Sequence, residues 1–216
     1  MGNAAVLEPS STQQYAADIY DYIVKVSAHF QVTPACIGID APLQPRRENT
    51  QWRVAEQALS AAGIRCFKTP TASEFDHIRA KAKQHLASGG ELSRIPHVMQ
   101  LWMLAGFDIA KRLAELAPVL EVFPQANIRL LQPNAPHKTR VGQADAQLKA
   151  IAEHTQWPVS PAEWQQLRYI CGGARHDKVD AYSAAWVASL APEQRRYFGQ
   201  LGSEQAPADA IWVPKL

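Results

Sequence analysis

Apolar residues recur at helical spacing along most of the chain. In residues 12–29 they return every three to four positions, which places them on one face of a helix. Comparable patterns predict six further helices, at 49–63, 73–87, 95–116, 139–154, 161–173 and 177–190. The helix at 95–116 is so apolar that we expect it to be buried on more than one side.

Turn and capping residues set the expected ends of these helices. Gly63 ends the helix at 49–63, and the glycine pair Gly172 and Gly173 ends the helix at 161–173. Ser73 has the character of an N-cap, with Asp76 three positions later as the second half of a loose capping box.

Short apolar runs bounded by proline or polar residues predict the strands. The run "ACIGID" at 35–40 lies between two prolines, and "VLEVF" at 119–123 is the second clear strand. "IRCF" at 64–67 is a candidate short strand, and "AIWVP" at 210–214 is a strand or an extended clip. Strands that alternate with helices indicate an α/β domain with a largely parallel sheet, whose functional groups gather at strand ends.

The composition limits the class of protein. A chain of 216 residues, 47% of them hydrophobic, predicts one domain, 1–216, with one sizeable core. The net charge of +2 neither favours nor excludes nucleic acid, and no dense basic-aromatic stripe of the kind found in single-strand binders is visible. No apolar run approaches the ~18 residues of a membrane helix, so we expect no membrane partner.

The cysteines indicate the cellular setting, and the absence of three sequence motifs argues against two classes of enzyme. Cys36, Cys66 and Cys171 form no C-x-x-C pair, which favours a reducing, cytoplasmic setting without a disulfide framework or a zinc ribbon. The chain carries no G-x-S-x-G, no G-x-x-x-x-G-K-[ST] and no G-x-G-x-x-G, so an esterase or a nucleotide-binding enzyme has little support.

Four acidic residues carry the candidate chemistry. Asp40 ends the first strand, on the same face as Gly38, and Glu121 lies inside the second strand. Asp177 and Asp180 are three positions apart at the start of the last helix, so they stack on one side of it. Small residues follow on this helix and allow close packing on a sheet: Ala181, Ala184, Ala185 and Ala188.

Each acid also has an ordinary structural interpretation, which stays open. Asp177 and Asp180 can be N-terminal caps, and Asp40 can form a strand-ending Asx turn. Glu121 is harder to explain in this way, because a glutamate in an apolar strand is costly unless it is paired or ligated.

The nearby histidines, lysine and arginines also have ordinary structural interpretations. His176 is more often a surface or capping histidine than a ligand, and His137 and Lys138 belong to a proline-rich loop. Arg46 and Arg47 are expected to be solvated, although they follow the turn after the first strand and can reach an anion there.

A divalent cation would join the four acids. Hard oxygen ligands without cysteine or paired histidine favour Mg²⁺ or Mn²⁺ over zinc. Two such ions about 4 Å apart can activate a water and stabilise the leaving oxygen in phosphodiester hydrolysis. The hypothesis is therefore a metal-dependent phosphodiesterase or nuclease.

Four stretches of this chain resemble one known family. "IGIDAPL", "EVFPQA", "HDKVDAYSAAWVASL" and "IWVP" are similar in content and order to the bacterial and archaeal family called domain of unknown function 429, from about residue 35 to the end. The D-x-x-D-A pair also resembles the last metal-binding motif of Holliday-junction resolvases. The resemblance implies a ribonuclease-H-like mixed sheet flanked by helices, a nuclease activity with nucleic acid as partner, and Asp40, Glu121, Asp177 and Asp180 as catalytic and metal-site residues.

The chain departs from the ribonuclease-H pattern at its beginning. That fold opens with a three-stranded meander whose first strand carries a central aspartate, whereas Asp40 is followed by a proline-rich turn and a helix and so matches the fourth strand. Either the gene start is placed too late or the meander has been lost. The alternative hypothesis is therefore a degenerate, non-catalytic module that acts in binding or scaffolding. Lys138 falls where the family tends to place a lysine before a glycine, here Gly142.

Overall fold

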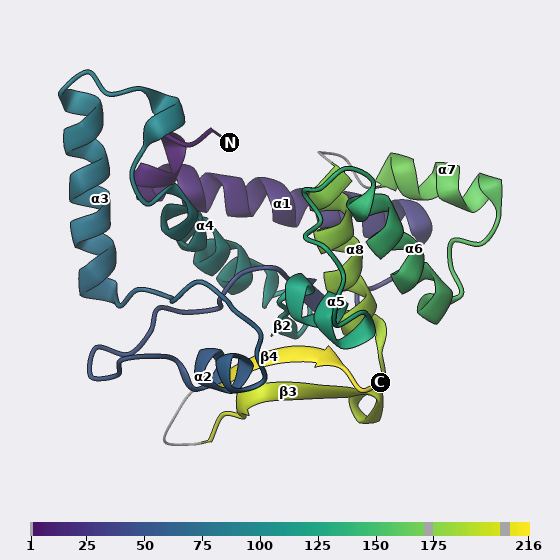
Figure 1. Ribbon diagram of the computed structural model, residues 1–216. Helices are drawn as coiled ribbons and strands as arrows, with labels where there is room; N and C mark the ends of the chain where they lie inside the picture. The colour runs from purple at the N-terminus through teal and green to yellow at the C-terminus, as the bar shows by residue number, and fades with distance from the viewer. Residues whose placement is uncertain (1, 171–174, 204–207) are drawn as a thin grey trace.

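The computed structural model describes residues 2–170, 175–203 and 208–216, and this part of the chain forms a mixed α/β structure (Figure 1). Its α-helices are α1 (Pro9–Phe30), α2 (Val54–Ala61), α3 (Ala72–Ala87), α4 (Val98–Leu113), α5 (Pro124–Leu131), α6 (Gln143–Thr155), α7 (Pro161–Ile170) and α8 (Arg175–Ser189). Short 3₁₀ helices lie at Ala5–Leu7, Leu92–Arg94 and Pro192–Gln194. Within these ranges, none of the helices has the length and apolar character needed to cross a bilayer.

Within the described residues the strands form two small sheets of opposite type. β1 (Ile37–Ile39) and β2 (Val119–Glu121) run parallel, and Ile39 pairs with Glu121. β3 (Arg195–Gln200) and β4 (Asp209–Pro214) form an antiparallel hairpin-like pair. An isolated parallel bridge between Val122 and Trp212 joins the end of β2 to β4. The expected α/β class is confirmed, but the antiparallel pair β3–β4 is longer than the parallel pair β1–β2, so the largely parallel sheet that the sequence predicts is not found in the described residues.

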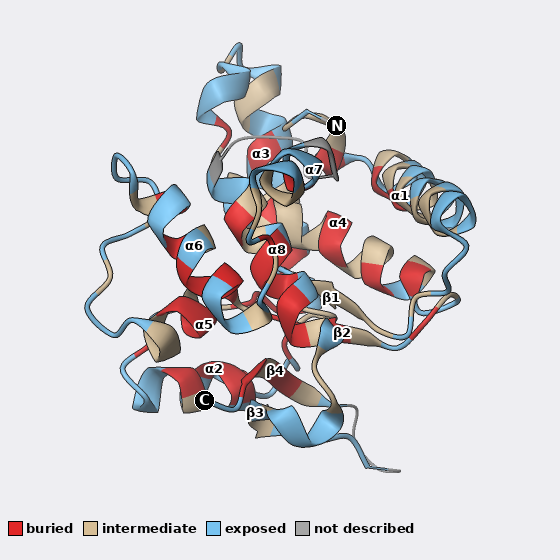
Figure 2. Ribbon diagram, turned by 90° about the vertical axis from the view of Figure 1, so that its right-hand side faces the viewer, coloured by how far each residue is buried: buried red, intermediate tan, exposed pale blue. Residues whose placement is uncertain are grey.

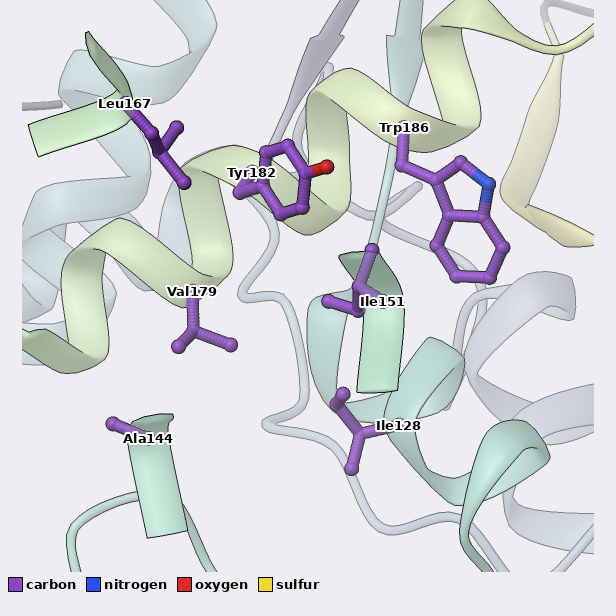
Figure 3. Close-up of a cluster of buried hydrophobic side chains, with 7 residues drawn as sticks. All are labelled: Ile128, Ala144, Ile151, Leu167, Val179, Tyr182 and Trp186. Carbon is purple, nitrogen blue, oxygen red and sulfur yellow. The ribbon is translucent and has the colours of Figure 1, made fainter. Parts of the chain in front are cut away.

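Helix α8 is central because it packs against both the sheet and the other helices. On one side Ala184 and Val187 join Leu120 and Val122 in an apolar cluster next to β2. On its other side Tyr182 and Trp186 lie in a larger cluster with residues from α5, α6 and α7, drawn in Figure 3. Figure 2 shows the buried residues concentrated along α8 and α5, while α1 presents a largely exposed outer face. Helix α8 is thus packed on two sides and keeps one exposed stripe.

The packing of α8 on β1 depends on a missing side chain. A Cβ added at Gly38 would clash with the carbonyl oxygen of Ala184, would lie 2.9 Å from its carbonyl carbon and 3.3 Å from the Cβ of Ala188. The expectation that small residues bring this helix close to the sheet is therefore confirmed for Ala184 and Ala188. Ala181 and Ala185 are exposed instead.

Several predicted boundaries and elements differ from the structure. The N-cap of α3 is Thr71, whose hydroxyl accepts from the Glu74 amide while the Glu74 carboxylate accepts from the Thr71 amide. This reciprocal pair leaves Ser73 inside the first turn. Residues 64–67 form no strand, because Ile64 and Cys66 are held by side-chain packing on a core cluster rather than by strand pairing. The patterns also missed α5 and β3, and the expected helix end at 172–173 lies outside the described residues.

Candidate carboxylate site

Asp40 and Asp180 come together because of the close contact between β1 and α8. Asp40 follows β1 two residues after Gly38, on the same face of the strand, and Asp180 precedes Ala184 by one helical turn, on the same face of α8. Since Gly38 and Ala184 touch, the two carboxyl groups are held on the same side of the contact. Asp40 and Asp180 are 140 positions apart in the chain, and this one packing contact brings them together.

The charge state of Asp40 reflects this crowding. Burial of its carboxyl group among protein atoms raises the pKa to about 7, and the carboxylates of Asp180, Glu121 and Asp177 add to the rise, while the ammonium of Lys138 lowers it. The residue nevertheless keeps an exposed surface. Water that reaches it screens these interactions, so solvent limits the size of the rise. The site therefore combines solvent access with an excess of negative charge.

Asp180 has one satisfied and one unsatisfied oxygen. Its Oδ2 binds the ammonium of Lys138, whose side chain is 19% exposed against 14% for Asp180. Its Oδ1 is buried and has no hydrogen-bond partner in the described protein. Burial raises the pKa of Asp180, and the hydrogen bond from Lys138 opposes that rise. A buried carboxylate oxygen without a donor is costly, which makes Oδ1 a candidate ligand atom.

Glu121 is engaged in a different interaction. Its two oxygens accept from both terminal nitrogens of Arg53, at 2.8 and 2.6 Å, and Oε2 also accepts from the Leu43 amide at 3.3 Å. Burial raises the pKa of Glu121, whereas the guanidinium of Arg53 lowers it. Arg53 cannot release its proton, so its charged guanidinium is buried in direct contact with the Glu121 carboxyl group. Glu121 is close enough to raise the pKa of Asp40, but both of its oxygens already accept hydrogen bonds from Arg53 or Leu43.

Arg53 is a residue that the sequence patterns did not identify. Its Nε donates to Asp209 at 3.0 Å, so one guanidinium joins the end of β2 to the start of β4. Asp209 in turn accepts from the Val54 amide at the beginning of α2. The apolar strand around Glu121 signals that a partner must exist, but nothing in the sequence distinguishes Arg53 from the other basic residues.

Asp177 lies one turn before Asp180 and is exposed. Its Oδ1 is 3.4 Å from Nε2 of His176, which is exposed as well. Because α8 begins at Arg175, Asp177 is in the first turn, where the helix dipole favours an acid, while Asp180 lies beyond the capping positions. The capping interpretation therefore remains open for Asp177 and does not hold for Asp180.

The neighbouring basic residues divide into buried and exposed ones. Arg46 is buried, donates to the Thr69 carbonyl and forms a 2.6 Å ion pair with Glu74, so the expectation that it is solvated is wrong. Arg47 is exposed, as expected, and His137 stays in an exposed loop. Lys138 is also in that loop, but its contact with Asp180 makes it part of the carboxylate site.

A cation at this place would have few protein ligands. Among the described residues, no group of three or more histidine, cysteine or acidic side chains is arranged to hold a metal ion. Asp40 and Oδ1 of Asp180 provide two hard oxygen donors. Mg²⁺ is commonly held by one or two carboxylates, with waters and substrate phosphates completing its shell. The donor set is therefore compatible with a partly hydrated Mg²⁺ or Mn²⁺.

Comparison with known proteins identifies the family. The model of the family described as "Protein of unknown function (DUF429)" matches residues 2–201, which is most of the chain. The chain belongs to the DUF429 family. In this DUF429 protein the match begins well before β1 and Asp40, and it ends before β4, so that the closing "IWVP" lies beyond it. No curated protein and no solved structure matches the chain.

Proposed function

We propose that this DUF429 protein hydrolyses phosphodiester bonds of nucleic acid with the help of Mg²⁺ or Mn²⁺ held by Asp40 and Asp180. The observation that carries the proposal is the buried, unpartnered Oδ1 of Asp180 next to a second carboxylate whose pKa is raised. A divalent cation would satisfy Oδ1 and remove the repulsion between the two acids. When bound, it would supply charge stabilisation to the phosphoryl oxygens and a more acidic water.

The other residues of the site have separate roles in this proposal. Lys138 contributes a fixed positive charge beside Asp180 and, on its loop, is in reach of a substrate phosphate. Asp177 is exposed one turn away, where its carboxylate can accept a hydrogen bond from the attacking water and orient it. Glu121 acts as a positioning residue, because it is held by Arg53 and binds the Leu43 amide, close to Asp40 in the chain.

A ribonuclease-H-like fold belongs to the same proposal. It is supported by the parallel pair β1 and β2, by acids at the ends of these strands, and by a helix with two aspartates packed against the sheet. We also propose a cytoplasmic location, which is supported by the free thiols of Cys36 and Cys66.

The test of the proposed activity is a cleavage assay with Mn²⁺ or Mg²⁺ on single-stranded, duplex and branched DNA and RNA. Cleavage by the wild-type protein is expected to require the metal and to be lost in Asp180→Asn. Asp76→Asn serves as the matched control, since this aspartate is 78% exposed on α3. Absence of cleavage by the full-length protein, or equal cleavage by Asp180→Asn, would sink the proposal.

A second candidate function is a non-catalytic binding or scaffold module. It is favoured by one observation, namely that the Lys138 ammonium already neutralises part of the charge of Asp180. The two candidates differ in their response to metal. A ligand that binds only the native state stabilises it, so a cation site predicts a higher thermal midpoint in millimolar Mn²⁺, whereas a scaffold predicts no shift.

A further inference from the structure

Two loops after β1 meet at a surface that carries both aromatic and basic side chains. The loop before α2 and the extended segment 64–71 are joined by a parallel bridge between Arg46 and Thr71 and by the hydrogen bond from Arg46 Nε to the Thr69 carbonyl. Next to these contacts, Nζ of Lys68 lies 5.6 Å from the centre of the Trp52 ring. We define the aromatic-basic surface as Arg47, Trp52, Arg65, Phe67 and Lys68.

The rings on this surface are turned toward solvent. Phe67 is 62% exposed and Trp52 is 37% exposed. In the segment 64–67 burial alternates, because Ile64 and Cys66 pack on a core cluster while Arg65 and Phe67 point outward. An exposed phenylalanine and an exposed arginine are thus presented side by side by a segment whose other face is fixed.

The charge of the surface is positive. Arg47 and Arg65 are exposed, and Lys68 is half-buried beside the indole of Trp52. Glu74 is paired with Arg46, whereas Glu48 accepts hydrogen bonds from the amide and hydroxyl of neutral Ser73 and keeps its negative charge, so the three cations still outnumber it. These two joined segments therefore carry three cations and two exposed rings.

The surface is linked to the carboxylate site through Arg53, the chain neighbour of Trp52. Trp52 immediately precedes Arg53, whose guanidinium binds Glu121 at the end of β2. Glu121 accepts from the amide of Leu43, three residues after Asp40. The backbone next to Trp52 is therefore held by the same contacts that fix the loop after Asp40.

We propose that the aromatic-basic surface binds single-stranded nucleic acid, with unpaired bases stacked on Trp52 and Phe67 and phosphates next to Arg47, Arg65 and Lys68. Base stacking on aromatic rings combined with a positive groove is the general mode by which single strands are bound without sequence preference. A duplex hides the faces of its bases and can use only the cations. The surface selects the strand, and its delivery to Asp40 and Asp180 rests on the function proposed above.

The binding test separates this inference from catalysis. Fluorescence anisotropy is measured in EDTA with the full-length protein and labelled strands of about 12 nucleotides, as oligo-dT, as oligo-rU and as a duplex. The single strands are expected to bind more tightly than the duplex. Phe67→Ala and Trp52→Ala should each weaken single-strand binding by roughly five- to a hundredfold, which is the usual effect of losing one stacked ring.

Two kinds of variant control for folding and for charge. Phe67→Tyr and Trp52→Phe retain a ring and should keep most of the affinity, and Tyr22→Ala removes a ring that is 59% exposed on α1 and should change nothing. Arg65→Gln should reduce the slope of log affinity against log salt by about 0.7, the value for one phosphate contact on a single strand. Thermal midpoints of all variants verify that they are folded.

The outcomes distinguish the two proposals. No binding, equal binding of duplex and single strands, or unchanged affinity in both alanine variants would overturn the inference about this surface. Ring-dependent binding of single strands without metal-dependent cleavage supports it and contradicts only the hydrolytic function. Metal-dependent cleavage with unchanged affinity in both alanine variants contradicts only the role of the surface.

Discussion

Gly38 on β1 and Ala184 on α8 are in direct contact, and there is no room for a side chain between them. A Cβ at position 38 would clash with the carbonyl oxygen of Ala184, which is backbone and cannot rotate away. This contact sets how close α8 comes to the parallel strands. Asp40 lies two residues after Gly38 on the same face of the chain, and Asp180 lies one helical turn before Ala184. The contact between Gly38 and Ala184 therefore also sets the separation of the two aspartates.

Gly38→Ala is therefore expected to destabilise the protein by about 1–3 kcal/mol, as other overpacking substitutions do. The helix has to move away from β1, which also loosens the packing of Ala184 and Val187 on β2. Urea unfolding monitored by circular dichroism measures the loss. Gly2→Ala is the matched control, since a Cβ at Gly2 would meet nothing within 4 Å. Equal stability of the two variants would show that the contact at Gly38 is not tight.

The sequence predicts the helices and strands around this contact for identifiable reasons. Residues 35–40 and 119–123 are apolar runs with clear boundaries, so β1 and β2 follow from the pattern. By contrast α5 begins with Pro124, after Val122 and Phe123 that follow β2, and a proline at the first turn replaces the usual polar cap. The exposed and half-buried residues of β3 do not alternate, and the strand has little apolar signal, so it depends on its partner β4.

The site was only partly predictable, because its partners come from loops. Gly38 and the small residues of α8 indicate close packing, which is enough to bring Asp40 and Asp180 together. The pattern cannot say that Lys138, in a proline-rich loop, reaches Asp180. The pattern also does not identify the basic residue that pairs with the carboxylate of the buried Glu121, because ion-pair partners depend on tertiary packing.

Arg53→Met tests how much the buried ion pair between Arg53 and Glu121 contributes to the stability of the protein. Removing one partner of a buried ion pair leaves an uncompensated charge and costs about 3–5 kcal/mol. The side chains of Arg53 and Glu121 are 4% and 6% exposed, so solvent replaces little of the lost interaction. We expect a large fall in the urea midpoint, and a smaller one in the double variant Arg53→Met with Glu121→Gln, which removes both charges.

The control for this prediction is an exposed ion pair. Arg94→Met breaks the pair with Glu91, whose side chain is 65% exposed, and should leave the midpoint unchanged. If Arg53→Met were as stable as Arg94→Met, the Arg53–Glu121 pair would not hold β2 in place.

Lys138→Met is expected to increase the affinity for Mn²⁺. The ammonium of Lys138 occupies Oδ2 of Asp180 and lowers the pKa of both Asp40 and Asp180, so it competes with any cation for their charge. Without it, the metal-induced rise in thermal midpoint should be larger and appear at lower Mn²⁺ concentration. Lys149→Met on the exposed face of α6 provides the control. A shift no larger than that of Lys149→Met would argue that Lys138 does not compete for the site.

The pH dependence of stability tests the crowding of Asp40. Its pKa rises from 3.8 to about 7 on folding, so the folded state holds this proton more tightly than the unfolded state. The associated stability is present below pH 4 and is lost as pH rises toward 7, where the carboxylate ionises beside Asp180. The wild-type protein without metal should therefore lose stability over this interval relative to Asp40→Asn, which cannot ionise. Parallel thermal midpoints from pH 4 to 8 measure the difference, and Mn²⁺ should abolish it in the upper half of the range. Curves that run parallel for both proteins without metal would mean that Asp40 ionises freely in the folded state.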